Sequence, residues 1–458
     1  MKNTSLYKIL CACCLLAVLG CSDYLEVETP KDHIDKTKVF SDDQLATAAL
    51  TQIYSLMRAN GFLSGTTSGV GVLLGCYTDE LEATTTRTVA FRNFYEGSVL
   101  SNNSGISELW NQSYKQIYMA NIMIEGLTAT NALAENIRRQ LLGEAYTVRA
   151  LIHLYLCQTF ADVPYVTTTD YKINQKMTKL KARQVLENVI EDLIEAEKLL
   201  VPAYPSAEKV RINQAAAQAL LARTYLYLEN WDKAAYYAKL VIENSAYDLD
   251  DLDKVFLKTS KSAIWQFKPE FEGKNALEAD SYIFESVPAP DVKIALDLLN
   301  AFEPDDNRKI EWLKGVGTGE VNFHAYKYRL RGGSLGGSST EYSTIIRVEE
   351  MYLIAAEAAA EQQNWDVCNE TINKIRSRVG LAEVSVANRE EAISTILQER
   401  RVELFCEYGH RFYDLKRKGR LNAVTLNKPG WQPHFSVLPL PENELLLNPN
   451  LLPQNIGY

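Results

Sequence analysis

The sequence predicts an all-α fold in which tetratricopeptide-like helix pairs form a scaffold and minor β-structure is confined to loop-rich segments. Three observations lead to this prediction. Apolar residues recur at helical spacing through most of the 458 residues. One helix-turn-helix pattern occurs twice. Two blocks, 61–107 and 245–342, are instead rich in glycine, serine, threonine and aromatic residues, which favours irregular structure there.

Residues 1–20 form a predicted lipoprotein signal peptide. Lys2 and Lys8 precede an apolar run over 9–19, and Gly20 stands directly before Cys21. The run is too short to cross a bilayer as a stable helix, which needs ~20 apolar residues. We therefore expect the signal peptide to be removed and Cys21 to be acylated, so that lipid alone anchors the mature chain to a membrane. The alternative is an ordinary signal peptide followed by a chance cysteine.

Four amphipathic helices are predicted in the region that follows. Ser41 and Gln44 form a capping box ahead of an apolar stripe that includes Ile53. Asp162-Val163-Pro164 ends the third helix, because proline cannot continue one. The predicted helices cover 41–56, 107–127, 136–160 and 182–200.

The helix-turn-helix repeat is the clearest internal signal. Helices over 213–228 and 231–244 are joined by Asn230-Trp231-Asp232, and the same three letters recur at 364–366. Small and apolar residues fall at the spacing of a tetratricopeptide repeat in both copies: Leu221, Ala222, Tyr225, Ala234 and Ala238, then Ala355, Ala356, Ala359, Cys368 and Ile372. Stacked pairs form a solenoid, which can be a concave docking surface or a scaffold. We favour a scaffold, because only about four such units fit.

Composition excludes several classes of function. The net charge of −10 argues against nucleic-acid binding and against a polybasic membrane patch. Beyond Cys21, the four cysteines have no metal-ligand spacing and are expected to be buried free thiols: Cys76, Cys157, Cys368 and Cys406. The five histidines also lack metal spacing, so we expect neither a metal nor a cofactor.

No catalytic motif stands out. A glycosidase needs two carboxylates across the scissile bond, and no pair is singled out, although Asp79-Glu80 precedes an aromatic block. The segment 399–417 alternates charged and apolar residues, which predicts a partly buried ion-pair network with a structural role. In the second loop-rich block, 263–268 is expected to be a strand and 331–337 a flexible glycine-rich turn.

Several sequence blocks together resemble the SusD/RagB family of outer-membrane nutrient-binding lipoproteins of Bacteroidetes. They lie at 21–26, 143–150, 160–164, 346–358, 372–381, 399–419 and 438–458. Two positions depart from the family pattern: Ala161 stands where glycine is usual, and Ile456 stands where proline is preferred. The resemblance covers essentially the whole mature chain.

The resemblance implies one domain over 21–458 with a loop-rich ligand-binding face. Its N-terminal helical half is 21–244, and its C-terminal half is 245–458, with a loop insertion at 245–342. It also implies a lipoprotein on the outer face of the outer membrane, which acts as a lid on a SusC-like, TonB-dependent barrel. The solenoid would then face the barrel. The implied activity is nutrient capture without chemistry.

A glycan site needs flat aromatic faces and side chains that bond hydroxyl groups, gathered in a concavity. The first loop-rich block offers Asp79, Arg87, Phe91, Arg92, Asn93, Phe94 and Tyr95, and the second offers Tyr282, Phe284, Trp312 and Tyr326. The alternative is that these aromatic rings pack the loops onto the helices.

The leading hypothesis is therefore a surface lipoprotein that binds an oligosaccharide and delivers it to a transport barrel. A peptide or another non-sugar nutrient is the nearest alternative. A structural lipoprotein that binds protein, or a glycan-cleaving enzyme, are alternatives of different classes.

Overall fold

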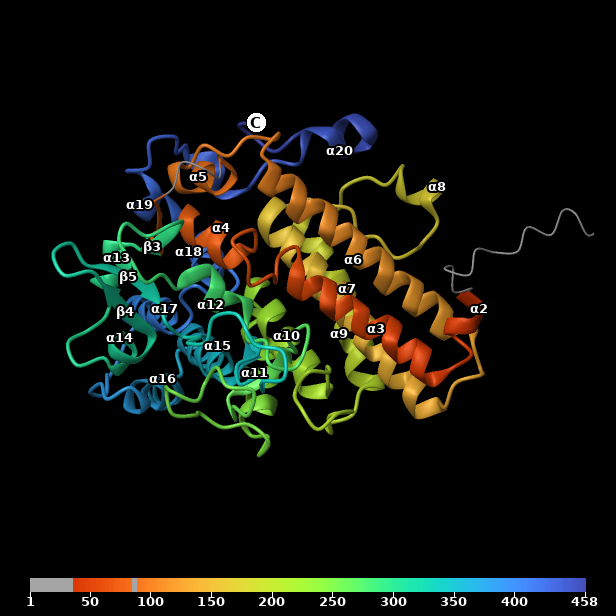
Figure 1. Cartoon of the computed structure of the whole chain (residues 1–458), viewed down its shortest axis with the longest axis horizontal. Coiled ribbons are helices and arrows are strands. Elements are labelled where there is room, and N and C mark those ends of the chain that lie inside the picture. The colour runs from red at the N-terminus through yellow and green to blue at the C-terminus, as the bar shows by residue number, and fades with distance from the viewer. Residues whose placement is uncertain (1–35, 85–88) are drawn as a thin grey trace, which may run out of the picture.

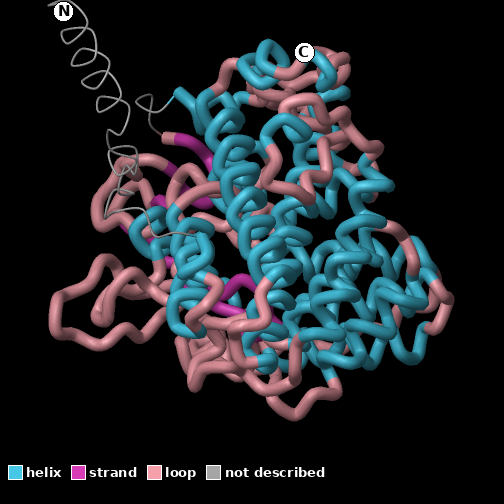
Figure 2. Tube along the Cα trace, turned by 90° about the vertical axis from the view of Figure 1, so that its right-hand side faces the viewer, coloured by secondary structure: helices cyan, strands magenta, loops and turns pink. Residues whose placement is uncertain are grey.

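The computed structural model describes residues 36–84 and 89–458. The predicted signal peptide and Cys21 lie outside this part of the chain. Within it, helices predominate, as predicted, and the strands form three short antiparallel pairs. The long helices lie side by side, whereas the strands and many short helices gather at the opposite end of the molecule (Figures 1 and 2).

The four helices predicted first are confirmed. They are α3 (Asp43–Ala59), α6 (Ser104–Ala129), α7 (Glu135–Phe160) and α9 (Ala182–Leu199). The predicted cap of the first helix is wrong: Asp42, not Ser41, caps α3. The Asp42 carboxylate accepts hydrogen bonds from Gln44 N at 2.9 Å and Leu45 N at 2.8 Å, whereas the Ser41 hydroxyl donates to Lys38 O. A carboxylate also favours the positive end of the helix dipole.

Helix α7 ends at a strained residue. Ala161 follows the helix with φ 62° and ψ −111°, and its N–H donates to Cys157 O at 3.0 Å. A left-handed φ costs an L-residue energy that glycine avoids. This backbone geometry explains why glycine suits position 161, and Pro164 lies just beyond, as predicted.

The predicted repeat is present as two equivalent helix pairs. The first is α10 (Gln214–Tyr227) with α11 (Trp231–Ile242), and the second is α15 (Val348–Glu361) with α16 (Trp365–Arg378). Asn230 and Asn364 cap the second helix of each pair through their side chains, with φ and ψ of −88° and 83° in one and −93° and 81° in the other. The same three letters therefore form the same turn.

The helix pairs form one continuous stack despite the long insertion between the two copies. Helix α9 packs on α10, α11 packs on α15, and α15 packs on both α16 and α17 (Arg389–Glu403). Most alanines of the repeat are buried at these contacts, which lets the helix axes approach closely: Ala222, Ala234, Ala238, Ala356 and Ala359. The stack thereby joins segments that are about a hundred residues apart in sequence.

The strands are short and tie the loop-rich blocks together. Strand β1 (Leu81–Ala83) pairs with β3 (Val292–Ile294), β2 (Ala263–Phe267) with β6 (Ser343–Arg347), and β4 (Leu313–Val316) with β5 (Asn322–Ala325). The strand predicted at 263–268 is confirmed to within one residue.

Short helices complete the described chain: α2 (Lys36–Val39), α4 (Val70–Tyr77), α5 (Val89–Glu96), α8 (Tyr171–Asn174), α12 (Leu277–Tyr282), α13 (Leu296–Leu299), α14 (Asn307–Trp312), α18 (His410–Arg417), α19 (Leu421–Thr425) and α20 (Glu442–Leu447). Two 3-10 turns, η2 (Pro433–Ser436) and η3 (Pro449–Leu451), lie near the C-terminus.

The four predicted free thiols are confirmed as buried and unpaired. Over 36–84 and 89–458, no helix has the length and apolar character needed to cross a membrane.

Candidate ligand-binding face

The two predicted site blocks meet at the strand-rich end of the molecule (Figure 1). Helix α5 packs beside β1, β1 pairs with β3, and β3 lies next to the β4–β5 hairpin. Strand β3 therefore connects the block around residue 90 with the block around residue 320. The fold brings together two segments that sequence analysis proposed separately.

Helix α5 sends its aromatic side into the core and its polar side outward. Phe91 and Phe94 are buried, and the Phe94 ring lies edge-on to Tyr77 at 5.8 Å between centroids. Arg92 remains 41% exposed in its side chain and pairs with Glu96 at 2.7 Å. Of the α5 candidates, the arginine is thus accessible, whereas the two phenylalanines fix the helix to the core.

Asn93 and Arg87 complete the candidates of this block. Asn93 is half-buried, and its amide donates to the Ser98 hydroxyl at 3.1 Å, which leaves it partly committed to the loop after α5. Arg87 lies outside the described residues.

Tyr95 lies at the centre of a polar cluster. The Lys428 ammonium lies 4.7 Å from the centroid of its ring and donates to Tyr95 O and Cys76 O, both at 2.8 Å. Glu82 and Lys293, directly opposite each other in the β1–β3 pair, form an ion pair at 3.3 Å nearby. Burial, followed by the charge of Glu82, raises the pKa of the Tyr95 hydroxyl, so it stays a hydrogen-bond donor at neutral pH.

Among the predicted aromatic candidates of the second block, Tyr326 is the accessible one. It is half-buried, with the Lys314 ammonium 4.8 Å and the Arg329 guanidinium 5.6 Å from its ring centroid. The buried His324 lies between it and Phe284, at 5.7 Å and 5.1 Å between ring centroids. A ring bordered by cations can contact both the apolar face and the hydroxyl groups of a ligand.

The other aromatic candidates of the second block pack inside the molecule. Phe284 is 4% exposed, Tyr282 donates its hydroxyl to Cys406 O at 3.2 Å, and Trp312 has no exposed surface. The Trp312 indole donates to Leu252 O at 3.0 Å and lies 4.9 Å from the Lys327 ammonium. These three rings hold the loops onto the helices and offer no face to a ligand in this conformation.

Asp79 belongs to an ion-pair cluster and not to an open surface. It is buried and accepts hydrogen bonds from Arg401 at 2.7 Å and from Arg411 at 2.9 and 2.8 Å. Burial would raise the pKa of its carboxyl group, but the two arginines outweigh burial and lower it. Asp79 therefore stays charged and links the end of α4 to α17 and α18.

Phe323 is a further accessible aromatic residue that was not among the predicted candidates. Its half-exposed ring lies over Gly315 of the neighbouring strand, so that a methyl group added at Gly315 would come within 3.2 Å of the ring. The alternation of side chains along β5 could have identified it, because Asn322 and His324 point inward and Phe323 points outward. Without knowledge of the strand, this signal could not be separated from the surrounding loop.

The accessible candidates near strand β3 thus form two groups, together called the accessible candidate face: Arg92, Asn93 and Tyr95 at α5, and Phe323 and Tyr326, which project from different sides of the β4–β5 hairpin. It combines three aromatic rings with donors and acceptors from side chains. Within the described residues, no group of three or more histidine, cysteine or carboxylate side chains is arranged to hold a metal ion. This chemistry suits the binding of a polar ligand with apolar faces.

The buried ion-pair network predicted for the charged segment is confirmed. Glu403 of α17 accepts hydrogen bonds from Arg347 at 2.6 Å, Arg378 at 2.7 Å and Arg308 at 3.1 Å, and all four side chains are buried. Burial by itself would raise the pKa of Glu403, but the three arginines lower it. The network lies inside the molecule and joins the helix stack to the loop insertion.

Comparison with known proteins gives consistent matches. A family model described as "Starch-binding associating with outer membrane" matches residues 23–226, and one described as "SusD family" matches residues 314–458. SusD-like protein P2 of Formosa agariphila is 28% identical, with 99% of each chain covered. SusD-like protein P25 of the same organism is 22% identical, over 100% of this chain and 99% of that protein.

Solved structures share the fold. A SusD superfamily protein from Bacteroides vulgatus superposes with a TM-score of 0.78 at 20% identity, over 92% of this chain and 100% of that one. A structure named as a laminarin binding SusD-like protein superposes with a TM-score of 0.74 at 22% identity, over 91% and 99% of the two chains.

Proposed function

Because this chain belongs to the SusD family, we propose that it captures an oligosaccharide at the cell surface and delivers it to a SusC-like, TonB-dependent barrel in the outer membrane. The two family matches, over 23–226 and 314–458, carry the proposal. The laminarin-binding relative supports a glycan as the ligand class. Acylated Cys21 would tether the lid to the outer face of the membrane.

The accessible candidate face supplies the chemistry for this role. Tyr95, Phe323 and Tyr326 offer aromatic rings for the apolar faces of sugar rings, and Arg92 and Asn93 offer hydrogen bonds to hydroxyl groups. A sugar that stacks on Tyr95 or Tyr326 would use the ring face opposite the neighbouring cation or displace that side chain. Capture requires no bond to break, so the protein acts by binding alone.

The ligand is tested by isothermal titration of the mature protein against a panel of laminarin, starch and other glycan oligosaccharides, with peptides of similar size as the competing class. Tyr95→Ala and Phe323→Ala are each expected to weaken binding of the recognised glycan about tenfold. Tyr118→Ala is the matched control, because Tyr118 is 42% exposed on α6, away from this face. If only the peptides bind, the ligand is a peptide and the glycan assignment is wrong.

The partner is tested by purifying the tagged, lipidated protein from detergent-solubilised outer membranes. A TonB-dependent barrel should copurify in a constant molar ratio. Recovery of the protein without any barrel would refute the lid role and leave glycan binding as a separate property.

A further inference from the structure

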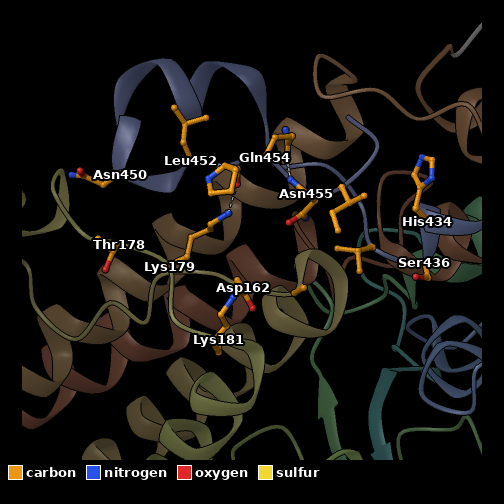
Figure 3. Close-up of a pocket in the computed structure, with 14 residues that line it drawn as sticks. Asp162, Thr178, Lys179, Lys181, His434, Ser436, Asn450, Leu452, Gln454 and Asn455 are labelled. Atoms are coloured by element: carbon orange, nitrogen blue, oxygen red, sulfur yellow. Dashed lines mark hydrogen bonds and ion pairs between the residues drawn. The ribbon is translucent and has the colours of Figure 1, made fainter.

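A polar cavity lies near the C-terminus, apart from the candidate face. It has a volume of about 730 Å³ and forms where three chain segments meet: 161–162 after α7, 178–181 before α9, and 434–456 near the end of the chain. Polar side chains from all three segments line it (Figure 3). The volume is within the range of small-molecule binding sites.

Hydrogen bonds hold the walls of this cavity in place. The Asn455 amide donates to Phe160 O at 2.9 Å and to Leu438 O at 2.7 Å. Gln454 exchanges hydrogen bonds with the backbone of Leu440, both at 2.8 Å. A cavity built this way is preorganised, so a ligand need not supply the energy to order its walls.

The charges in the cavity do not balance. Lys179 and Lys181 line it with one carboxylate, that of Asp162. Asp162 is already committed, because it accepts from the Lys181 ammonium at 2.8 Å and from Ala182 N at 3.0 Å. One positive charge therefore remains without a counter-ion among the residues that line the cavity.

Lys179 carries that unbalanced charge. It is half-buried and its ammonium donates to a neutral oxygen, Pro453 O, at 2.5 Å (Figure 3). Within the described chain, no carboxylate lies within 4.0 Å of this ammonium. Burial lowers the pKa of Lys179, as expected for a partly desolvated cation that an anion would stabilise.

Other hydrogen-bonding side chains line the same cavity, with Thr178 near Lys179 and with His434 and Ser436 at the opposite side (Figure 3). Leu452 and Ile456 add an apolar wall at its edge. A ligand that fits must therefore carry a negative group, several hydroxyl groups and some apolar surface.

We propose that this cavity is a subsite for an acidic saccharide, in which the Lys179 ammonium binds the anionic group of the sugar. Thr178, His434 and Ser436 bond its hydroxyl groups, and Leu452 and Ile456 contact its apolar edge. The anionic group is a carboxylate, as in a uronic acid, or a sulfate ester. The inference rests on the proposed function for the ligand class, but it concerns a separate surface.

The test is isothermal titration of the mature protein with trigalacturonate, with a sulfated disaccharide and with neutral maltotriose at low salt. At least one of the two acidic probes should bind more tightly than maltotriose, and its identity separates carboxylate from sulfate. Lys179→Gln should weaken that probe at least tenfold, whereas Lys179→Arg should retain most of the affinity. Lys176→Gln is the control, since Lys176 is exposed in the same segment but does not line the cavity.

Each other outcome contradicts the inference. Equal binding of acidic and neutral probes, or equal effects of Lys179→Gln and Lys176→Gln, would overturn it. If Tyr95→Ala abolishes binding of the acidic probe and Lys179→Gln does not, the acidic sugar binds at the candidate face and the proposed function stands alone. Inorganic sulfate that binds as tightly as the acidic probe would make the cavity a simple anion site. If no glycan of either panel binds to the protein, the proposed function itself is refuted.

Discussion

Replacing Arg308 tests whether the buried charge network stabilises the fold. Arg308 has no exposed surface, and its guanidinium donates five hydrogen bonds to the carboxylates of Asp306, Glu399 and Glu403, at 2.8 to 3.2 Å. Arg308→Met replaces the charged side chain with an apolar, unbranched side chain that fills much of the same space. The three carboxylates then stay buried with one cation fewer.

The expected loss follows from what each carboxylate retains. Glu403 keeps Arg347 and Arg378, and Glu399 keeps Arg376, but Asp306 has no other cationic partner in the described chain. Removing one partner of a buried ion pair costs about 3–5 kcal/mol, mostly because a buried charge is left uncompensated. We therefore expect Arg308→Met to lower the free energy of unfolding by that amount.

The assay is urea denaturation followed by circular dichroism at pH 7.5. Arg389→Met is the matched control, because Arg389 is 62% exposed and its ion pair with Glu361 should contribute at most about 1 kcal/mol. Adding Asp306→Asn to Arg308→Met should recover part of the loss, since it removes the carboxylate left alone. If Arg308→Met costs no more than Arg389→Met, the reasoning about uncompensated buried charge fails.

Three further predictions concern pH, backbone strain and anchoring. Burial lowers the pKa of His410 to about 4, so the folded state does not take up the proton that the unfolded state binds below pH ~6.5; the free energy of unfolding should fall by about 2–3 kcal/mol from pH 7.5 to 4.5 through this group, and His410→Gln should reduce that fall, whereas an unchanged fall in this variant would contradict the assignment. Ala161→Gly should raise the free energy of unfolding by about 1 kcal/mol by relieving the positive φ, whereas Ala235→Gly within α11 should lower it by a similar amount, and a loss for both would contradict the strain argument. Cys21→Ser should move the protein from the membrane fraction to the soluble fraction of lysed cells, and continued membrane retention would refute the lipid anchor.

Local signals in the sequence predicted most helices. The period of apolar residues and the stop at Pro164 act within a few residues, so they appear in the sequence without knowledge of the fold. The repeated turn is the clearest case, because the same letters at 230–232 and 364–366 adopt the same backbone angles. Such signals locate a helix end to within about one residue, since the predicted cap of α3 is Ser41 and the observed cap is Asp42.

Exposure of the candidate site residues could not be predicted in the same way. Phe94 and Tyr95 are neighbours on α5, yet the Phe94 ring is in the core and the Tyr95 ring is half-exposed. Which ring is covered depends on how α5 packs against α4 and β1, and that packing involves segments distant in sequence. Phe323 was missed for the same reason, since its exposure depends on the pairing of β4 with β5.

Residue types at short, regular spacing were sufficient to predict the helical class, the repeat, the family resemblance and the buried ion pairs of the charged segment. The folded chain was needed to see that Arg308, Arg347 and Arg378 converge on Glu403, and that the segment near Lys179 meets the segment near Pro453 to form a cavity. Burial and charge balance depend on contacts between segments that are distant in sequence, and the spacing of residues along the chain does not specify those contacts.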